Sequence, residues 1–210
     1  HEQSVNHSGV EKMKRLNALT VGGLLAVAVS LGAGAKEQPV DRYLTGDLEG
    51  MHAFDASLDL SGYQVVTGFD GQDKQVEKLS AKKGKTLLIT FWDRSCLICR
   101  SYLKDLDELQ RQMGDDKFEV VAIDIGRNTF SYTENSFKRW GVSSLKPYGS
   151  HHNGIVNEVK ANPMFRFYGK EPKSLLVDGS GKVRAYSSVT RDWLSDEGKA
   201  LIDALKKGEL

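Results

Sequence analysis

Apolar and polar positions alternate in short blocks along the chain from about residue 62 onward. Two strand-like runs, Tyr63–Thr67 and Lys74–Lys78, flank an Asp70-Gly71 turn, and this arrangement is typical of a β-hairpin. A continuous apolar run follows at Thr86–Trp92. A run without polar interruptions predicts a strand that is buried on both faces of a sheet.

Helical spacing begins directly after this apolar run. Apolar positions share one face at steps of four, three and seven residues, with Leu109 alongside: Cys99, Leu103, Leu106 and Met113. Charged residues take the other face, and Gly114 is a helix stop. We therefore predict an amphipathic helix with Cys96 in its first turn and Cys99 on its buried face.

The rest of the chain continues the alternation of strands and helices. The pattern predicts a strand at Phe118–Ile125, a helix at Ser131–Trp140, a loop at Ser143–Gly154, a hairpin of Ser174–Val177 with Lys182–Tyr186, and a final helix at Arg191–Lys207. This order of elements indicates an α/β fold with a mixed central sheet flanked by helices.

The first 35 residues differ in character from the rest. Met13-Lys14-Arg15 precedes an apolar stretch from Ala18 to Leu31, and small residues follow up to Ala35. A basic start, a short apolar run and a small-residue ending predict a signal peptide, Met13–Ala35, that is cleaved on export. An uncleaved membrane anchor is the alternative, although the run is shorter than a spanning helix needs.

These features divide the chain into three parts. Residues 1–35 form the signal peptide with a polar extension upstream of it, and residues 36–61 form an irregular lead-in. Residues 62–210 form the folded domain. The predicted location is periplasmic or otherwise extracytoplasmic, because a signal peptide directs export.

The amino-acid composition excludes several classes of protein function. The chain has 210 residues, of which 40% are hydrophobic, and this is enough to build a core. Its 29 basic and 28 acidic residues nearly cancel, which argues against nucleic acid as a partner. Two cysteines alone cannot form the disulfide framework of a small secreted protein or a four-cysteine zinc site.

Both cysteines lie in one short motif, Cys96-Leu97-Ile98-Cys99. A helix N-terminus lowers the pKa of a nearby thiol, and the thiolate is the nucleophile in disulfide exchange. We expect the Cys96 sulfur to face solvent and to attack a substrate disulfide, and the buried Cys99 to resolve the mixed disulfide. The alternative is a structural bridge, but a loop this short stabilises a fold by only about 2 kcal/mol.

The segment Thr90–Arg100 resembles the active-site region of thioredoxin-fold proteins. The resemblance is closer to the extracytoplasmic TlpA/ResA-like thiol–disulfide oxidoreductases, and it extends to the hairpin near Tyr63 and to Pro172–Val183. It implies a thioredoxin-like fold with an N-terminal β-hairpin extension and no required cofactor or metal. It also implies that Pro172 is cis, packs beside the cysteines and, with Trp92 and Glu171, contributes to a substrate-binding surface.

The chain departs from the family pattern at several positions. Ser95 stands where a second tryptophan is usual, and Thr90 replaces the buried acid of thioredoxin. Glu171 stands where a small residue or threonine is usual, and a carboxylate facing Cys96 would raise the pKa of its thiol. The resemblance favours a reductase of protein disulfides that is recharged by a redox partner, with a membrane electron donor as one candidate.

Two other functions are compatible with the motif. A thioredoxin-fold copper-delivery protein would use Cys96, Cys99 and His152, because thiolates and imidazole suit copper. The cysteines of such proteins are one residue further apart, and His151-His152 lie in a predicted loop, so this is the second choice. The other candidate is a non-catalytic interaction module in which the cysteines are incidental.

Overall fold

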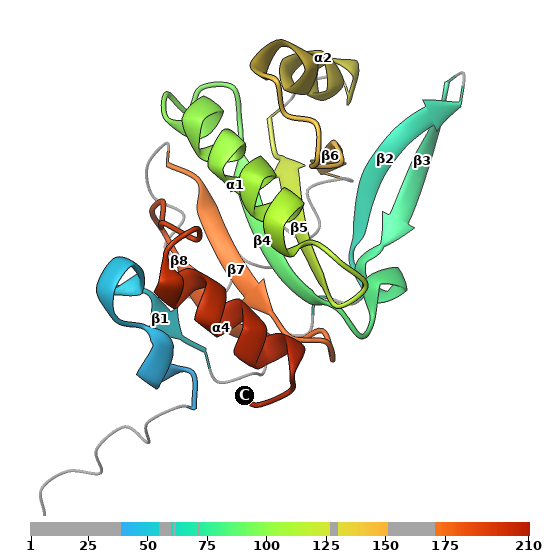
Figure 1. The fold of residues 1–210 in the computed structure, drawn as a ribbon. Helices are drawn as coiled ribbons and strands as arrows, with labels where there is room; N and C mark the ends of the chain where they lie inside the picture. Colours follow the sequence, from blue (N-terminus) through green and yellow to red (C-terminus); the bar gives the residue numbers. More distant parts are fainter. Residues whose placement is uncertain (1–38, 55–59, 61, 71, 127–129, 151–170) are drawn as a thin grey trace, which may run out of the picture. The chain divides into compact units, whose positions relative to one another are not determined.

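The computed structural model describes residues 39–54, 60, 62–70, 72–126, 130–150 and 171–210 (Figure 1). All of them belong to one compact unit, Glu37–Leu210. The predicted signal peptide and the pair His151-His152 lie outside the described residues. None of the helices within the described ranges has the length and apolar character needed to cross a bilayer.

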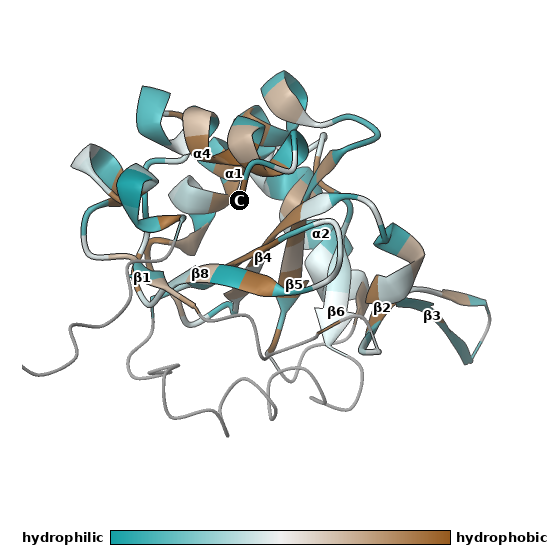
Figure 2. Ribbon diagram, turned by 90° about the horizontal axis from the view of Figure 1, so that it is seen from below, coloured by the Kyte–Doolittle hydropathy of each residue, from teal (hydrophilic) through white to brown (hydrophobic). Residues whose placement is uncertain are grey.

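Eight strands form one mixed sheet in the order β1-β8-β7-β4-β5-β6-β2-β3. Their bounds are β1 His52–Ala53, β2 Gln64–Asp70, β3 Asp73–Lys78, β4 Thr86–Trp92, β5 Phe118–Asp124, β6 Tyr148–Ser150, β7 Lys173–Val177 and β8 Val183–Ser187. β4 is parallel to β5 and antiparallel to β7, so it lies at the centre of the sheet. Figure 2 shows β4 and β5 in the apolar colours and the edge strand β3 in hydrophilic ones.

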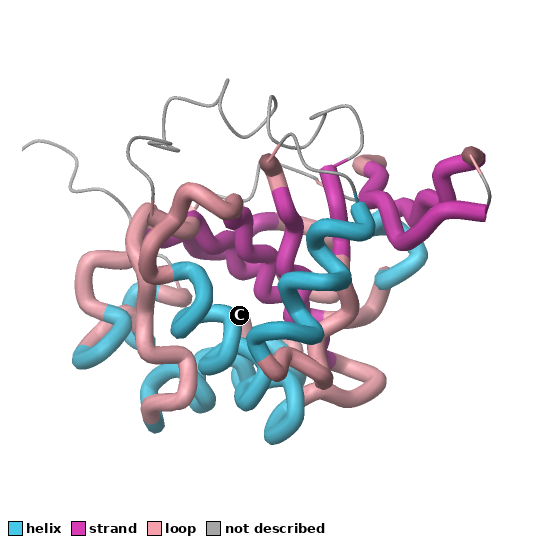
Figure 3. The backbone as a smooth tube through the Cα atoms, turned by 90° about the horizontal axis from the view of Figure 1, so that it is seen from above, coloured by secondary structure: helices cyan, strands magenta, loops and turns pink. Residues whose placement is uncertain are grey.

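The helices of the described residues are α1 Cys99–Met113, α2 Phe130–Trp140 and α4 Asp196–Lys206. Three short 3-10 helices are η1 Asp41–Tyr43, η2 Gly46–Leu48 and η3 Leu79–Lys82. Figures 1 and 3 show α1 and α4 together on one side of the sheet. The predicted α/β architecture with an N-terminal hairpin is confirmed.

Side chains of β4 alternate between two cores, as its uninterrupted apolar sequence requires. Leu88 and Trp92 pack in a cluster with the buried faces of α1 and α4. Leu87, Ile89 and Phe91 pack in a second cluster on the opposite face. Every residue of β4 is buried, so the predicted strand Thr86–Trp92 is confirmed together with its burial on both faces.

The amphipathic helix is confirmed with one change in its buried face. Cys99, Leu103, Leu106 and Leu109 are buried, whereas Met113 is only half-buried. Tyr102 is buried with them, three residues after Cys99, although the apolar pattern did not include it. The phenol ring supplies apolar surface to the core while its hydroxyl needs a polar partner.

The final helix begins later than the sequence predicts. Its N-cap is Ser195, whose hydroxyl accepts a hydrogen bond from the backbone N–H of Gly198 at 3.2 Å. The predicted start at Arg191 is therefore wrong. A serine side chain that satisfies a free N–H of the first turn is a strong local start signal for a helix.

Two short strands were not predicted. Within the predicted loop Ser143–Gly154, β6 pairs parallel with β5 and antiparallel with β2, and it thereby attaches the N-terminal hairpin to the sheet. The lead-in contributes β1, which pairs with β8, and Leu48 of η2 enters the core next to α1. Strands of two or three residues are too short to show periodicity, so only the sheet reveals them.

Candidate redox site

Cys96 and Cys99 form a disulfide, with a distance of 5.3 Å between their Cα atoms. The pair lies where the chain leaves the carboxyl end of β4 and enters α1. The helix begins at Cys99 and not before it, so the expectation that Cys96 occupies the first helical turn is wrong. Cys96 lies in the preceding turn, and its carbonyl accepts a hydrogen bond from the N–H of Cys99 at 3.4 Å.

The turn that carries Cys96 is held by Asp93. One carboxylate oxygen of Asp93 accepts hydrogen bonds from the backbone N–H and the hydroxyl of Ser95, both at 2.6 Å. The backbone carbonyl of Asp93 accepts from the N–H of Cys96 at 3.2 Å. An aspartate that bonds to its own backbone two residues on is a common way to fix a tight turn. The serine that departs from the family pattern therefore has a structural partner.

The two cysteines differ in exposure, but less than expected. Cys96 is 8% exposed and Cys99 is 1% exposed. Cys96 was expected to face solvent; it is the more accessible cysteine, yet most of its surface is covered. The residues between them are the exposed part of the motif, because Leu97 is 96% exposed and Ile98 is 41% exposed.

Strand pairing brings Pro172 to the same end of the sheet. Phe91 on β4 is opposite Lys173 on β7, so Pro172, one residue earlier, is level with the end of β4. Pro172 is buried and Glu171 is exposed. The side-chain ammonium of Lys173 donates a hydrogen bond to the backbone carbonyl of Ser188 at 2.5 Å, which connects β7 to the segment after β8.

Trp92 is buried in this structure. Its side chain is 1% exposed and is covered by two aromatic rings of α2. The ring centroid of Phe137 lies 5.9 Å from that of Trp92, and the ring centroid of Trp140 lies 5.6 Å away. Trp92 is therefore packed as a core residue, and its expected contact with a substrate stays a prediction.

A buried group of hydroxyls lies on the α1 side of the sheet, and sequence reasoning missed most of it. The Tyr102 hydroxyl accepts a hydrogen bond from the indole N–H of Trp193 at 2.8 Å and lies 3.2 Å from Ser174 Oγ. Ser174 Oγ in turn lies 2.9 Å from Thr90 Oγ1. Burial raises the pKa of Tyr102, and the surrounding hydrogen bonds only partly oppose this. The available signal was the position of Tyr102, one helical turn after Cys99.

A buried charged group lies on the opposite face and does not belong to the site. Lys82 Nζ is 2.7 Å from Glu119 Oε1 and donates to the Tyr148 hydroxyl at 2.8 Å. Burial alone would raise the pKa of Glu119, but the hydrogen bonds from Lys82 and Tyr148 outweigh it and lower that pKa. This group joins η3, β5 and β6, so its role is structural.

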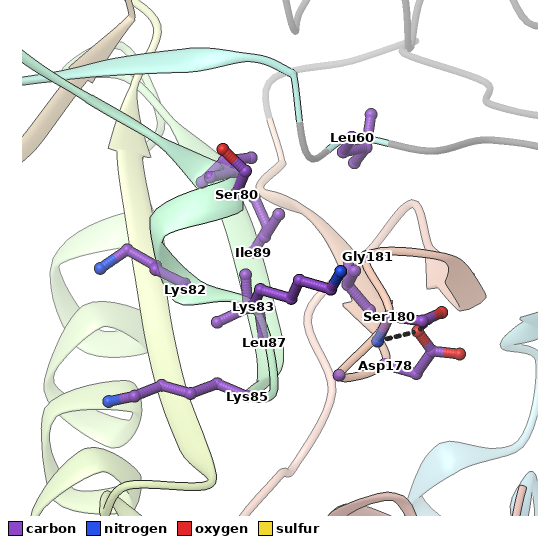
Figure 4. Close-up of a pocket in the computed structure, with 13 residues that line it drawn as sticks. Leu60, Ser80, Lys82, Lys83, Lys85, Leu87, Ile89, Asp178, Ser180 and Gly181 are labelled. Carbon is purple, nitrogen blue, oxygen red and sulfur yellow. Dashed lines mark hydrogen bonds between the residues drawn. The ribbon is translucent and has the colours of Figure 1, made fainter.

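A small pocket lies near the start of β4, at the end of the strand away from the cysteines (Figure 4). Leu60, Leu87 and Ile89 supply its apolar wall, and Lys83 extends towards Gly181. Lys82 and Lys85 point away from Asp178 on the far side of the pocket. The pocket lies apart from the disulfide and brings no reactive pair of side chains together.

The copper alternative is not tested by the structure. Among the described residues, no three histidine, cysteine or acidic side chains are grouped closely enough to hold a metal ion. His152, the third ligand of that hypothesis, lies outside those residues, as does His151. The copper function therefore stays a prediction.

Comparison with solved structures identifies the fold. A thiol:disulfide interchange protein from Bacteroides sp. has a TM-score of 0.53 and 20% identity, with 72% of this chain and 94% of that chain covered. A DsbF homologue from Corynebacterium diphtheriae has a TM-score of 0.54 and 17% identity, with coverages of 75% and 94%. A secreted thiol-disulfide isomerase from Corynebacterium glutamicum has a TM-score of 0.53 and 15% identity, with coverages of 76% and 95%.

No family model matches the chain. The fold is nevertheless thioredoxin-like, as the resemblance in the sequence implied, and the solved proteins that share it include a thiol:disulfide interchange protein. The redox-motif spacing and the disulfide are present in this chain itself.

Proposed function

We propose that this protein is a thiol–disulfide oxidoreductase that exchanges electrons with disulfides in other proteins. The observation that carries the proposal is the Cys96–Cys99 disulfide at the junction of β4 and α1, with Cys96 the more accessible residue. The reactive unit is complete without a metal or organic cofactor, because two thiols and a disulfide differ by two electrons and two protons.

The two cysteines take different roles in the reduced protein. The Cys96 thiolate attacks one sulfur of a substrate disulfide, forms a mixed disulfide and releases the other substrate sulfur as a thiolate. Cys99 then loses its proton and attacks the Cys96 sulfur, which restores the Cys96–Cys99 disulfide and releases the second substrate thiol. The free N–H groups at the start of α1 favour a thiolate nearby, although Cys96 precedes the helix by one turn.

The direction of electron flow that we propose is reduction of the substrate. The protein would act in the periplasm or another extracytoplasmic space, and a dithiol protein or a membrane electron donor would return it to the reduced form. The predicted signal peptide and the secreted isomerase among the structural neighbours support this location. Pro172 and Glu171 would border the substrate, because strand pairing brings them to the cysteine end of the sheet.

The roles are tested with a matched pair of serine variants. Reduced wild-type protein should reduce the interchain disulfides of insulin. Cys99→Ser should accumulate a mixed disulfide at residue 96, and Cys96→Ser should do neither. Activity retained in Cys96→Ser would contradict the proposal. Equilibration with a glutathione buffer tests the direction, and a reductase should have a potential nearer to about −270 mV than to about −120 mV.

A further inference from the structure

The hydroxyl of Tyr102 is the centre of a buried polar group next to the candidate site. It accepts a hydrogen bond from the indole N–H of Trp193 at 2.8 Å. It also lies 3.2 Å from Ser174 Oγ, which is 2.9 Å from Thr90 Oγ1. Tyr102, Ser174 and Thr90 are all 5% exposed or less, so water does not compete for these bonds.

Donor and acceptor counting sets the direction of the bond to Trp193. An indole N–H can only donate, so the phenol oxygen of Tyr102 accepts it. Hydroxyls both donate and accept, so either hydroxyl can donate in the contact between Tyr102 and Ser174 and in the contact between Ser174 and Thr90. Every polar atom of the group has a partner, so the loss of one hydroxyl would leave buried donors unpaired.

These bonds connect the two halves of the site. Tyr102 lies on α1 three residues after Cys99, and both residues are on the buried face of the helix. Ser174 lies on β7 two residues after Pro172, while Thr90 lies on β4 two residues before Trp92. The hydrogen bonds among Tyr102, Ser174 and Thr90 therefore connect the first turn of α1, which carries Cys99, to β4 and β7.

These hydrogen bonds affect the position of Cys99 most when the Cys96–Cys99 disulfide is broken. In the mixed disulfide, Cys96 is bonded to the substrate and the covalent link to Cys99 is absent. Only non-covalent contacts then hold Cys99 in position to attack the Cys96 sulfur. The rate of an intramolecular attack depends strongly on how well the two groups are held, and a displacement of about 1 Å can cost a large factor.

We propose that Tyr102 is a positioning residue for the resolving step, in which Cys99 attacks Cys96 and the substrate thiol leaves. The inference rests on the proposed function, because it assigns Tyr102 to one half of that reaction. Tyr102 touches no reacting atom in this role. It acts through Cys99, by means of its bonds to Ser174 and Trp193.

The test measures the two half-reactions separately in full-length protein. Reduced protein is mixed with 5,5′-dithiobis(2-nitrobenzoate), whose first thionitrobenzoate is released when Cys96 attacks and whose second is released when Cys99 resolves. In Tyr102→Phe we expect the first phase to keep its rate within about twofold and the second to slow by about tenfold. The mixed disulfide should accumulate and be visible by intact-protein mass spectrometry.

Tyr148→Phe is the matched control, because Tyr148 is a fully buried tyrosine whose hydroxyl bonds Lys82 and Glu119 on the opposite face of the sheet. It should lower stability without changing the ratio of the two phases. Ser174→Ala is a smaller change in the same hydrogen-bonded cluster, and it should also slow the second phase. It keeps the test valid if Tyr102→Phe folds poorly.

Different results would refute the proposed function and the positioning role of Tyr102. If the wild-type protein shows no first phase, the proposed function fails. If both phases are present in wild type and Tyr102→Phe leaves their ratio unchanged, the function stands and the positioning role is refuted. An equal change in Tyr148→Phe would also refute it, because the effect would then follow stability and not the position of Cys99.

Discussion

Trp92 and Phe137 stack with their ring centroids 5.9 Å apart and their planes inclined by 27°. This contact places the last residue of β4 beneath α2, so the aromatic residue before the cysteine turn belongs to the core. The indole N–H of Trp92 is buried without a hydrogen-bond partner in the described residues. The side chain thus contributes through its apolar surface and not through its polar atom.

The first prediction concerns this tryptophan. Trp92→Ala should lower the free energy of unfolding by about 3–5 kcal/mol, because it opens a large cavity in a packed core. Trp92→Phe should cost clearly less, since it keeps an aromatic ring, leaves a smaller cavity and removes an N–H that has no partner. Urea unfolding followed by far-UV circular dichroism measures both. A loss for Trp92→Phe as large as that for Trp92→Ala would contradict the prediction, because the retained ring would then contribute nothing.

The second prediction concerns the turn that Asp93 holds. Asp93→Ala removes the acceptor of two hydrogen bonds from Ser95 and should lower stability by about 1–2 kcal/mol. The looser turn should also make the Cys96–Cys99 disulfide form less readily, which equilibration with glutathione measures. Asp93→Asn is the control, because its side-chain oxygen can accept the same bonds. If Asp93→Ala matches wild type in both measurements, the carboxylate does not fix the turn.

The third prediction compares the contributions to stability of exposed Leu97 in the cysteine motif and of buried Leu106 on α1. Leu97→Asp should change the free energy of unfolding by less than about 0.5 kcal/mol, because the side chain is 96% exposed. Leu106→Ala, at 0% exposure, should cost about 2–5 kcal/mol.

The same Leu97→Asp variant also reports on substrate contact. We expect the KM for a protein disulfide to rise severalfold, because an apolar contact is replaced by a charge. The rate with the small disulfide 5,5′-dithiobis(2-nitrobenzoate) should stay within about twofold. An unchanged KM for the protein substrate would show that Leu97 does not contact it.

The fourth prediction concerns acid stability. The pKa of Glu119 is lowered in the folded protein by its bonds to Lys82 and Tyr148. A lowered folded-state pKa stabilises the fold above the ordinary glutamate value of about 4.3, and this contribution is lost as the pH falls through the folded-state value. The pKa of Lys82 is raised, so its ammonium stays charged throughout this acid range and the loss follows the protonation of Glu119.

Glu119→Gln tests this relation. The variant should be less stable than wild type at pH 7, because the buried ammonium of Lys82 loses its main charge partner. The difference should shrink as the pH falls below about 4, where wild type loses the same interaction. Denaturant titrations at several pH values measure it. A difference that is constant from pH 7 to pH 3 would contradict the assignment.

Local patterns accounted for much of the fold. The uninterrupted apolar sequence of β4 fixed both of its bounds, and the spacing of Cys99, Leu103 and Leu106 placed the buried face of α1. These features depend on the period of a strand or a helix, which a few neighbouring residues reveal. The spacing of Cys96 and Cys99 indicated the redox site in the same way, because the motif spans only four neighbouring residues.

The contacts that complete the site join residues far apart in the chain. Tyr102 bonds Ser174 and Trp193, which are 72 and 91 residues away. No local pattern can pair such residues, because the pairing depends on which strands become neighbours in the sheet. For the same reason, the burial of Trp92 under α2 appeared only once the elements were assembled.

The sequence by itself determined the order of the main strands and helices, and it placed two cysteines one turn apart beside a buried strand. The tertiary structure decided that Cys96 lies just before the helix, and it brought Pro172, Tyr102 and the short strand β6 to their places. Periodicity is set by neighbouring residues, whereas accessibility and hydrogen-bond partners are set by distant segments that pack together.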